Sequence, residues 1–415
     1  MIIKNFRELA TTKARKDALE IVNAGIESVL VEKTIEREMH VSRNSVEIQG
    51  KKWKLSRDSR IFVVGAGKAA ADMARAVEKK LAGRISEGIV IDTRSVKLKK
   101  VRVVHGTHPL PSQKNLDATQ KIISILEGAR GGDIIFNLIS GGGSALMEYP
   151  RVSLPKLIQV NKLLLKGGAG IEEINAVRKH ISRIKGGQLS ALAGKAKVIT
   201  LIVSDVITND LNVIASGPSV PDPTTVKDAE RIRKRYRLPA LPFVETPKNK
   251  LPNTTNILLI TNKVAVAAME KKAKRLGYKT RILTTELKGE ARDEGERLSK
   301  MAKPKIALIA AGETTVTVKG SGKGGRNQEL ALSASGFIKR GVLVSSSTDG
   351  VDFITEAGGG IVDENTREKA ENLGLNAGEF LKNNDSYNFL RRVNGIIRMG
   401  KTGTNVCDLI VVLGE

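Results

Sequence analysis

The stretch DIIFNLISGGGSALM, residues 133–147, decides the fold, because an apolar run stops abruptly at three consecutive glycines. Residues 134–139 are too few for an independent helix and rich in β-favouring side chains, so they predict a buried strand. Residues 140–144 predict a tight turn, since glycine adopts positive φ without a Cβ clash. A glycine-rich turn at a strand end also lets converging N–H groups bind a phosphate or carboxylate. These residues alone leave a ligand cradle and a turn without a ligand equally open.

Length and composition indicate a globular protein of two or three domains. The chain has 415 residues, and domains usually contain roughly 100 to 200. Its hydrophobic content of 40% and charged content of 27% are ordinary for a soluble protein. No apolar run approaches the ~20 residues of a membrane helix, and the first residues contain no signal-peptide core. We therefore expect a cytoplasmic protein with no membrane partner.

The net charge of +25, from 69 Lys and Arg against 44 Asp and Glu, is the unusual global property. Such an excess fits a nucleic-acid partner, an acidic small substrate or a generally basic proteome. The basic residues are spread along the chain, and aromatic residues, at 3%, offer little for base stacking. We therefore expect no nucleic-acid partner. The histidines and the single cysteine, Cys407, lack zinc-ligand spacing, and the apolar run around Cys407 predicts a buried thiol.

A second glycine turn follows the strand predicted over residues 61–64. Small residues occupy the positions that a strand, turn and helix require, namely Gly65, Gly67 and Ala70. With Asp92 ending the next strand, this resembles the dinucleotide-binding fingerprint, a weak signal because many such turns need small residues. Lys68 adds a positive charge beside the turn. That charge suits a phosphoryl group or a carboxylate, or else Lys68 is a solvated residue at a helix start.

Asp205 follows another all-apolar strand, predicted over residues 198–203. Open α/β sheets bind ligands outside the carboxyl ends of their strands. Asp205 is therefore a candidate Mg²⁺ ligand, or else a loop cap.

A proline-rich segment, residues 238–255, predicts a linker between two domains, 1–245 and 246–415. After it, strand patterns again alternate with helical patterns, and hairpin signals are lacking. Such alternation predicts an α/β fold in two domains, with mostly parallel sheets and helices on both faces.

Two glycine-rich stretches in the final third lead to opposite conclusions. Residues 395–402, GIIRMGKT, satisfy the P-loop pattern but lie between two predicted strands, whereas a P-loop must open a helix. We therefore reject a P-loop site. In residues 320–329, GSGKGGRNQE, Arg326 stands where a helix is predicted to begin. Free N–H groups, the helix dipole and the Arg326 guanidinium are expected to converge on one anion, or else this is a flexible hairpin tip. With scattered Lys, Arg and Asp, these loops fit phosphoryl transfer around a Mg-nucleotide.

The same stretches resemble the MOFRL-type glycerate 2-kinases, in one order over nearly the whole chain. The shared segments are VVGAGKAA (63–70), THPLPS (107–112), LISGGGSALM (138–147), INAVRKHISRIKGGQL (174–189), SDV and VIASGPSVPDPTT (204–225), AAGETTV and GGRNQELAL (310–332), TDG (348–350), NNDSY (383–387) and TGTNVCDL (402–409). A set of this extent is far more specific than any single motif.

The resemblance implies an ATP- and Mg²⁺-dependent kinase that phosphorylates D-glycerate at the 2-hydroxyl, giving 2-phosphoglycerate and ADP. It implies a Rossmann-like N-terminal domain, a MOFRL-type C-terminal domain and an active site in the cleft between them. Lys68 and Arg326 match the family's central pair. Our own hypothesis adds Asp205 as the third catalytic residue, with Asp205 or Asp349 expected to bind Mg²⁺ or accept the hydroxyl proton. The other implied substrate- and nucleotide-binding residues are Gly65, Gly67, Ser140, Gly141, Gly142, Gly143, Ser144, Lys185, Gly324, Gly325, Asn327, Asn384 and Asp385.

Three places depart from the family's pattern. Lys401 stands where a proline is usual, and residues 207–209 and 351–354 replace the usual turns after SDV and TDG. They bear on loop conformation and nucleotide preference, not on Lys68 or Arg326. The oligomeric state is not given by the sequence, so a homodimer stays open. The alternatives are an NAD(P)-dependent hydroxypyruvate reductase, indicated by the same Gly65 turn, and a non-enzymatic basic nucleic-acid-binding protein.

Overall fold

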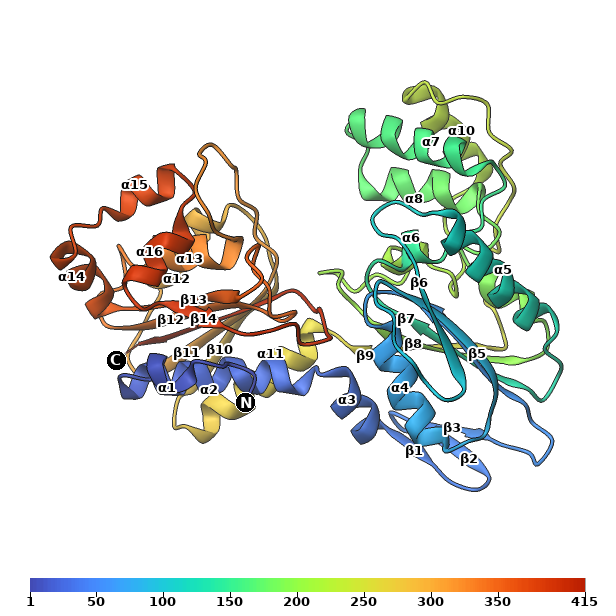
Figure 1. Cartoon of the computed structure of the whole chain (residues 1–415), viewed down its shortest axis with the longest axis horizontal. Coiled ribbons are helices and arrows are strands. Elements are labelled where there is room, and N and C mark those ends of the chain that lie inside the picture. Colours follow the sequence, from blue (N-terminus) through green and yellow to red (C-terminus); the bar gives the residue numbers. More distant parts are fainter. Residues whose placement is uncertain (415) are drawn as a thin grey trace. The chain divides into compact units, whose positions relative to one another are not determined.

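The computed structural model describes residues 1–414, which form two compact units (Figure 1). One contains residues 34–259, and the other combines residues 1–33 with the chain from residue 260 onward. The predicted domains, 1–245 and 246–415, differ from this division at both ends. The first 33 residues belong with the C-terminal half. The boundary between the two units lies after Leu259, which is beyond the proline-rich segment in which it was predicted.

The first unit is built on a six-stranded sheet with the order β6-β5-β4-β7-β8-β9. Its strands are β4 (Ile61–Ala66), β5 (Ile85–Asp92), β6 (Val101–His105), β7 (Ile134–Ile139), β8 (Lys197–Val203) and β9 (Thr254–Ile260). The pairings of β5 with β6, β4 with β5, β4 with β7 and β7 with β8 are all parallel. Taken in chain order, this is the Rossmann arrangement 3-2-1-4-5-6, which confirms the predicted Rossmann-like α/β domain. The strand order reverses between β4 and β7.

Helices cover this sheet and extend beyond it. They are α4 (Ala70–Leu81), α5 (Gln113–Glu127), the short α6 (Gly143–Leu146) and α9 (Gln188–Leu192). Ile122 and Leu126 of α5 pack in one core cluster with Phe62, Val64 and Ile135 of the strands. The apolar spacing of α5 thus buries one face on the sheet, as a helical period requires.

Two smaller layers complete the first unit. A helical layer contains α7 (Leu154–Lys166), α8 (Ile171–His180) and α10 (Val226–Arg235), with its own core around Leu157, Val177 and Ile232. The other layer has α3 (Val31–Glu38), which the unit boundary crosses, and an antiparallel sheet of β1 (Met39–Val41), β2 (Ser45–Ile48) and β3 (Lys51–Lys54). A 3-10 turn, η1 (Ile214–Ser216), lies beside α6 and α8.

The second unit contains a mixed sheet with the order β10-β11-β15-β12-β13-β14. The strands are β10 (Lys279–Leu287), β11 (Ile306–Gly312), β12 (Gly341–Ser347), β13 (Ala357–Asp363), β14 (Ile396–Arg398) and β15 (Asp408–Gly414). Only β10 and β11 pair in parallel, and the other four pairings are antiparallel. This sheet therefore differs from the predicted mostly parallel one. The last strand, β15, inserts between β11 and β12, and β12 returns directly into β13.

Helices cover both faces of this sheet. Figure 1 shows α1 (Phe6–Leu9), α2 (Lys13–Ser28) and α11 (Asn262–Arg275) on one face. The opposite face carries α12 (Ala291–Lys300), α13 (Arg326–Ala334), α14 (Glu364–Asn372), α15 (Ala377–Lys382) and α16 (Ser386–Arg392). The N-terminal α2 packs on α11, β12 and β15, and a Cβ added to Gly25 would come within 2.7 Å of Met269. Close packing of this kind explains why residues 1–33 belong to the second unit.

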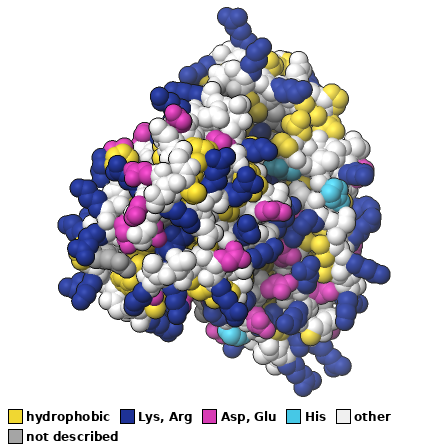
Figure 2. Space-filling view, turned by 60° about the vertical axis from the view of Figure 1, so that its left-hand side comes forward, with side chains coloured by type: hydrophobic (Ala, Val, Ile, Leu, Met, Phe, Trp, Pro, Cys, Tyr) yellow, Lys and Arg dark blue, Asp and Glu magenta, His cyan; other side chains and the backbone are white. Residues whose placement is uncertain are grey.

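The surface and the rejected P-loop agree with the sequence analysis. Lys and Arg side chains lie all around the visible face in Figure 2, with Asp and Glu side chains between them. Within residues 1–414, no helix is long and apolar enough to cross a membrane. The segment after Thr402 leads into β15 rather than into a helix, so the rejection of a P-loop at residues 395–402 is confirmed.

The buried ion pair between Arg15 of α2 and Asp363 at the end of β13 ties the N-terminal helix to the sheet. The Arg15 Nη1 atom lies 2.9 Å from Asp363 Oδ2, and both side chains are less than 10% exposed. We expect Arg15→Met to lower the free energy of unfolding of this unit by about 3–5 kcal/mol, because it leaves a buried carboxylate unpaired. Urea denaturation of the full chain measures the change.

The control is Arg367→Met in α14 of the same unit, because its ion pair with Glu371 is exposed on both sides, at 69% and 62%. An exposed ion pair is worth about 0–1 kcal/mol, so this variant should unfold almost as the wild type does. Equal, small losses in both variants would contradict the anchoring role of Arg15.

Candidate active site

The turn after β4 and the loop after β7 meet where the strand order of the first sheet reverses. The Lys68 N–H donates to the Gly141 carbonyl at 2.9 Å, and the Ser140 N–H donates to the Ala66 carbonyl at 3.2 Å. The Ala69 N–H donates to Ser140 Oγ at 3.0 Å. Ligands of open α/β sheets bind outside the carboxyl ends of the strands at such a point.

Two of the predicted glycines are required by close contacts. Gly67 has φ +144°, and a Cβ there would lie 2.0 Å from Ser140 Oγ. A Cβ on Gly141 would lie 2.0 Å from Asp205 Oδ2. Any larger residue would separate the two loops or displace the Asp205 carboxylate. Asp205, which follows β8, therefore lies directly against the backbone of the glycine loop.

The glycine loop presents open hydrogen-bond donors beside Lys68. In the described part of the chain, the N–H groups of Gly141, Gly142 and Ser144 have no protein acceptor. Lys68 is exposed, and within residues 1–414 its ammonium group has no ion-pair partner. Adjacent free amides and an unpaired ammonium group favour an anion. Of the two interpretations that the sequence left open, the geometry favours the cradle.

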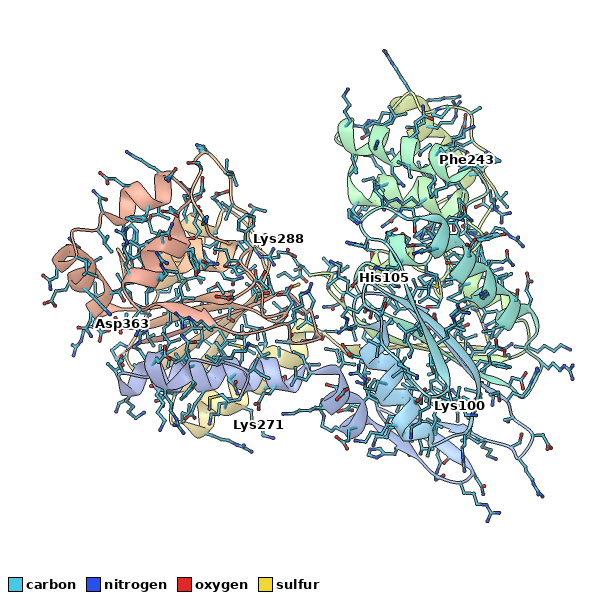
Figure 3. All side chains as sticks on the ribbon, viewed as in Figure 1. Lys100, His105, Phe243, Lys271, Lys288 and Asp363 are labelled. Carbon is cyan, nitrogen blue, oxygen red and sulfur yellow. The ribbon has the colours of Figure 1, made fainter. Side chains whose placement is uncertain are left out.

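His108 lies at the same place, although its sequence segment gave no spacing signal. A Cβ on Gly142 would be 3.1 Å from His108 Cδ2 and 3.3 Å from Lys68 Cγ. Burial lowers the pKa of His108 below its ordinary value, and the positive charge of Lys68 lowers it further. His105, labelled in Figure 3, is the last residue of β6 and shows the edge of the sheet at which these loops lie.

Lys185 is buried and binds the glycine loop through its backbone carbonyls. Its side chain is 1% exposed and its Nζ lies 2.7 Å from the Ser144 carbonyl, 3.2 Å from the Met147 carbonyl and 3.2 Å from Glu148 Oε2. An ammonium group has three donors, and all three have protein acceptors here. Burial lowers the pKa of Lys185, and Glu148 partly offsets the effect. Lys185, expected to bind substrate, instead positions the loop.

Asp92, the carboxylate of the dinucleotide-like fingerprint, is fully occupied. The Ala71 N–H donates to Asp92 Oδ2 at 2.9 Å, and Arg94 donates to both carboxylate oxygens. The Asp92 side chain is completely buried. In dinucleotide sites, the corresponding acidic residue must be free to accept the ribose hydroxyl. The arrangement therefore disfavours a nicotinamide cofactor at the Gly65 turn.

In the second unit, Arg326 begins α13 and is held by two carboxylates. Its Nε lies 2.6 Å from Asp408 Oδ2, and its Nη1 lies 2.6 Å from Glu313 Oε1. Burial acts to lower the pKa of Arg326, but the two carboxylates outweigh it and raise the pKa. Burial raises the pKa of Glu313, while Arg326 opposes the rise. Sequence reasoning missed Asp408 and Glu313 as partners, because both lie far from residue 326 in the chain.

The glycine loop before α13 differs from its predicted role. Its amides were expected to be free for an anion, but the N–H groups of residues 319–323 all donate to residues 383–385. Asn384 Oδ1 accepts from Lys319 and Gly320, and Asp385 Oδ1 accepts from Lys323. The side chain of Asn383 and its carbonyl accept from Ser321 and Gly322 respectively. Asn384 and Asp385 thus shape this loop rather than offer themselves to a ligand.

The start of α13 is likewise capped from within the protein. The buried Asp352 carboxylate accepts from the N–H groups of Asn327 and Gln328 at 3.2 and 2.9 Å. A Cβ on Gly325 would lie 2.4 Å from the Asp352 carboxyl carbon, and one on Gly324 would lie 1.9 Å from Ser386 Oγ. These glycines therefore allow close packing, and their role in ligand binding stays a prediction.

Neither predicted Mg²⁺ ligand belongs to a preformed cage. Within residues 1–414, no three His, Cys, Asp or Glu side chains are grouped as metal ligands. Asp349 Oδ1 accepts from Ser347 Oγ at 2.7 Å and from the Val351 N–H at 2.9 Å. Mg²⁺ commonly uses one or two carboxylates together with substrate phosphates, so a single carboxylate beside the amide cradle suffices. Asp205 fits that requirement better than Asp349.

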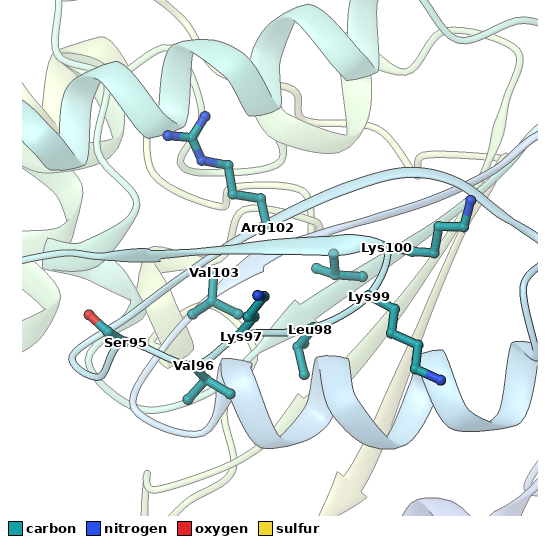
Figure 4. A pocket seen from close by; sticks show the side chains of 9 residues that line it. Ser95, Val96, Lys97, Leu98, Lys99, Lys100, Arg102 and Val103 are labelled. Atoms are coloured by element: carbon teal, nitrogen blue, oxygen red, sulfur yellow. The ribbon is translucent and has the colours of Figure 1, made fainter.

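A surface hollow elsewhere does not compete with this site. It has a volume of about 590 Å³ and is lined by the consecutive residues 95–103. Figure 4 shows that the side chains of Lys99, Lys100 and Arg102 diverge, so their charges do not converge on one ligand. The hollow contains none of the predicted site residues.

A Rossmann-ordered sheet that presents a lysine, open amides and a carboxylate at its switch point defines an α/β enzyme acting on anionic substrates. Residues 306–408 match the MOFRL family, and residues 17–246 match a domain of unknown function, DUF4147. Glycerate 2-kinase of Pyrococcus horikoshii is 39% identical to this chain, over 96% of this chain and 97% of the relative. D-glycerate 2-kinase of Thermotoga maritima is 38% identical, over 96% and 98%. The crystal structure of glycerate kinase from T. maritima matches with a TM-score of 0.88 and 35% identity, covering 96% of this chain and 99% of that one. The chain belongs to the MOFRL-type glycerate 2-kinase family.

The proximity of Lys68 and His108 leads to a titration prediction. Replacing Lys68 by Met should raise the pKa of His108, because a nearby positive charge is removed, while burial still holds it below the ordinary value. NMR titration of the histidine ring resonances measures the change, and His108→Gln assigns the signal. Lys52→Met, in β3, is the control and should leave the titration unchanged. An unchanged pKa in Lys68→Met would place the ammonium group elsewhere.

Proposed function

We propose that this chain is an ATP-dependent kinase that phosphorylates D-glycerate at its 2-hydroxyl, giving 2-phosphoglycerate and ADP. The observation that carries the proposal is the open cradle of Gly141, Gly142 and Ser144 amides beside Lys68, in a chain that matches glycerate 2-kinases along almost its full length. Phosphoryl transfer requires chiefly that anions be positioned and their charge neutralised. The cradle supplies both requirements.

Each group at the switch point has a role in this scheme. The loop amides and Lys68 hold anionic oxygens and favour the charge that grows on them during transfer. Burial and the charge of Lys68 lower the pKa of His108, which favours its neutral form. A neutral imidazole can donate or accept a hydrogen bond without adding a further positive charge. Arg326, fixed by Asp408 and Glu313, keeps its charge at every ordinary pH and is the second cation of the proposed pair.

Asp205 is the residue that would hold Mg²⁺. Its carboxylate lies against Gly141, next to the amides that would hold phosphate oxygens. Bound there, the cation would neutralise phosphate charge. Asp349 stays a second candidate ligand through its carboxylate, in the unit that carries Arg326.

Some relatives carry the name of a different enzyme, and the Gly65 turn of this chain bears on whether that activity applies here. One from Agrobacterium vitis, 35% identical over 85% of this chain, is named provisionally as a hydroxypyruvate reductase. For this chain, Asp92 is bound to the start of α4 and to Arg94, and Lys68 stands where a dinucleotide needs no charge. The kinase is therefore the better supported proposal.

Lys68→Ala and Arg326→Ala should each lower turnover by about 10² to 10³, the usual effect of removing a charged contact made mainly in the transition state. The measurement couples ATP-dependent reaction of D-glycerate to enolase, which accepts 2-phosphoglycerate directly. Arg326 also pairs with the buried Asp408, so thermal unfolding of each variant is recorded. Lys323→Ala, an exposed lysine of the same glycine loop, should keep turnover within about two-fold and serves as control. Near-wild-type rates in both site variants would refute these roles.

A nicotinamide assay tests the alternative. With hydroxypyruvate and NADH or NADPH, we expect no change in nicotinamide absorbance above that of a blank. Steady oxidation of the nicotinamide at a rate matching or exceeding glycerate phosphorylation would replace the kinase proposal with a reductase.

A further inference from the structure

Arg178, in α8, carries an unpaired charge in a partly buried position. Its Nε donates to Asn161 Oδ1 at 2.7 Å, but within residues 1–414 no carboxylate forms an ion pair with its guanidinium. Among the same residues the terminal amino groups have no acceptor, and they are not among the fully buried unpartnered atoms. Burial lowers the pKa of Arg178, and the charge of Glu148 offsets this only partly. A partly buried arginine without an anionic partner keeps donors and a charge available for an anionic ligand.

Asn175 lies one helical turn earlier and also has an unused donor. Its side chain is 4% exposed, and its Oδ1 accepts from Ser216 Oγ at 2.9 Å. The Asn175 Nδ2 group is buried and has no hydrogen-bond partner among the residues that the structure describes. Residues three apart share a helix face, so Asn175 and Arg178 present their donors on the same side of α8. The unpaired Asn175 amide is unusual, since buried polar groups are nearly always paired, and the Arg178 guanidinium beside it adds donors that still reach solvent.

A chain of hydroxyl contacts connects this face to the amide cradle. Ser216 Oγ, which donates to Asn175, also lies 2.9 Å from Ser144 Oγ. The carbonyl of Ser144 accepts from Lys185, and the charge of Arg178 lowers the pKa of that lysine. Arg178 is therefore close enough to act electrostatically on the base of the loop whose amides are open.

We propose that Asn175 and Arg178 form an anion subsite beside Ser144, which binds an anionic oxygen group of a substrate, either the carboxylate of glycerate or a phosphate of ATP. The inference rests on the proposed function and adds a second set of donors to the same site. A guanidinium binds two oxygens of a carboxylate or phosphate at once, and the Asn175 amide adds a third donor. The unpaired donors then acquire their partner when substrate binds.

The test measures binding and turnover separately on the full chain. Arg178→Met removes the charge, and Asn175→Asp places a carboxylate where the amide now donates. Isothermal titration with D-glycerate alone and with ATP alone should show about 10- to 100-fold weaker binding of one ligand, the loss expected for a charged hydrogen bond. Binding of the other ligand should stay within about two-fold. The ligand affected identifies the group bound, and its KM should rise by the same factor. Arg178→Lys should recover part of the loss.

Asn161→Ala is the matched control, because it removes the one protein contact of the Arg178 guanidinium and keeps the charge. It should bind both ligands within about three-fold of wild type. The subsite is overturned if Arg178→Met and Asn175→Asp bind both ligands as the wild type does. It is also overturned if Asn161→Ala matches Arg178→Met, or if both ligands are weakened equally together with a lower thermal midpoint, because these results indicate a structural role.

Failure of the proposed function gives a different result. If the wild type forms no 2-phosphoglycerate, the kinase proposal fails. The subsite is then judged by binding of D-glycerate and of inorganic phosphate alone. Weaker binding of either probe to Arg178→Met supports the subsite, and unchanged binding of both overturns it.

Discussion

Three hydrogen bonds between the turn after β4 and the loop after β7 set the geometry on which the Rossmann unit depends. Each contributes only about 0.5–1.5 kcal/mol on its own, but together they extend the parallel pairing of β4 and β7 beyond the strand ends. The ladder aligns Gly65 with Leu138 and Ala66 with Ile139. Because side chains alternate along a strand, a slip of one residue would turn each buried side chain to the other face. The hydrogen bond between Lys68 and Gly141 therefore depends on the register of β4 with β7.

The loop after β7 is also fixed by a buried ion pair, between Lys185 and Glu148. Lys185 binds two carbonyls of the loop segment and the Glu148 carboxylate, so a cation is buried without an unpaired donor. A buried ion pair contributes little net stability, but it allows few alternative geometries. The backbone of residues 141–144 is thereby fixed, while the neighbouring Lys68 side chain stays exposed. A fixed set of amides beside an exposed ammonium group suits a site that positions anions and neutralises their charge.

The sequence predicted the local elements well because they follow from local rules. The predicted apolar runs of four to six residues, such as 61–64 and 134–139, lie in buried strands, and the glycine turns after β4 and β7 allow contacts that no Cβ would permit. The antiparallel pairing of the second sheet was not predicted, because β15 pairs with strands that lie far away in the chain. The amphipathic pattern of α2 shows that one face is buried but not which sheet covers it.

The site was predicted in part for similar reasons. Residue type and strand ends indicated Lys68, Asp205 and the glycine loop. His108 was missed because a lone histidine in a turn has no periodic signal, and its place beside Lys68 depends on the fold. The loop before α13 was predicted only in part, because glycine content shows that amides are accessible, not that they are free. Side chains sixty residues later, Asn384 and Asp385, occupy those amides.

The membership of residues 1–33 in the second unit has a consequence for biosynthesis. Chains leave the ribosome at about 5–20 residues per second, and domains usually fold as they emerge. Here α2, among the early helices of the sequence, packs against β15, the latest strand in residues 1–414. The Rossmann unit can complete its fold while translation continues, whereas the apolar face of α2 is fully covered only after α11, β12 and β15 have all been made. Protection of that waiting helix by a nascent-chain chaperone would matter more for this protein than for one whose domains follow each other in order.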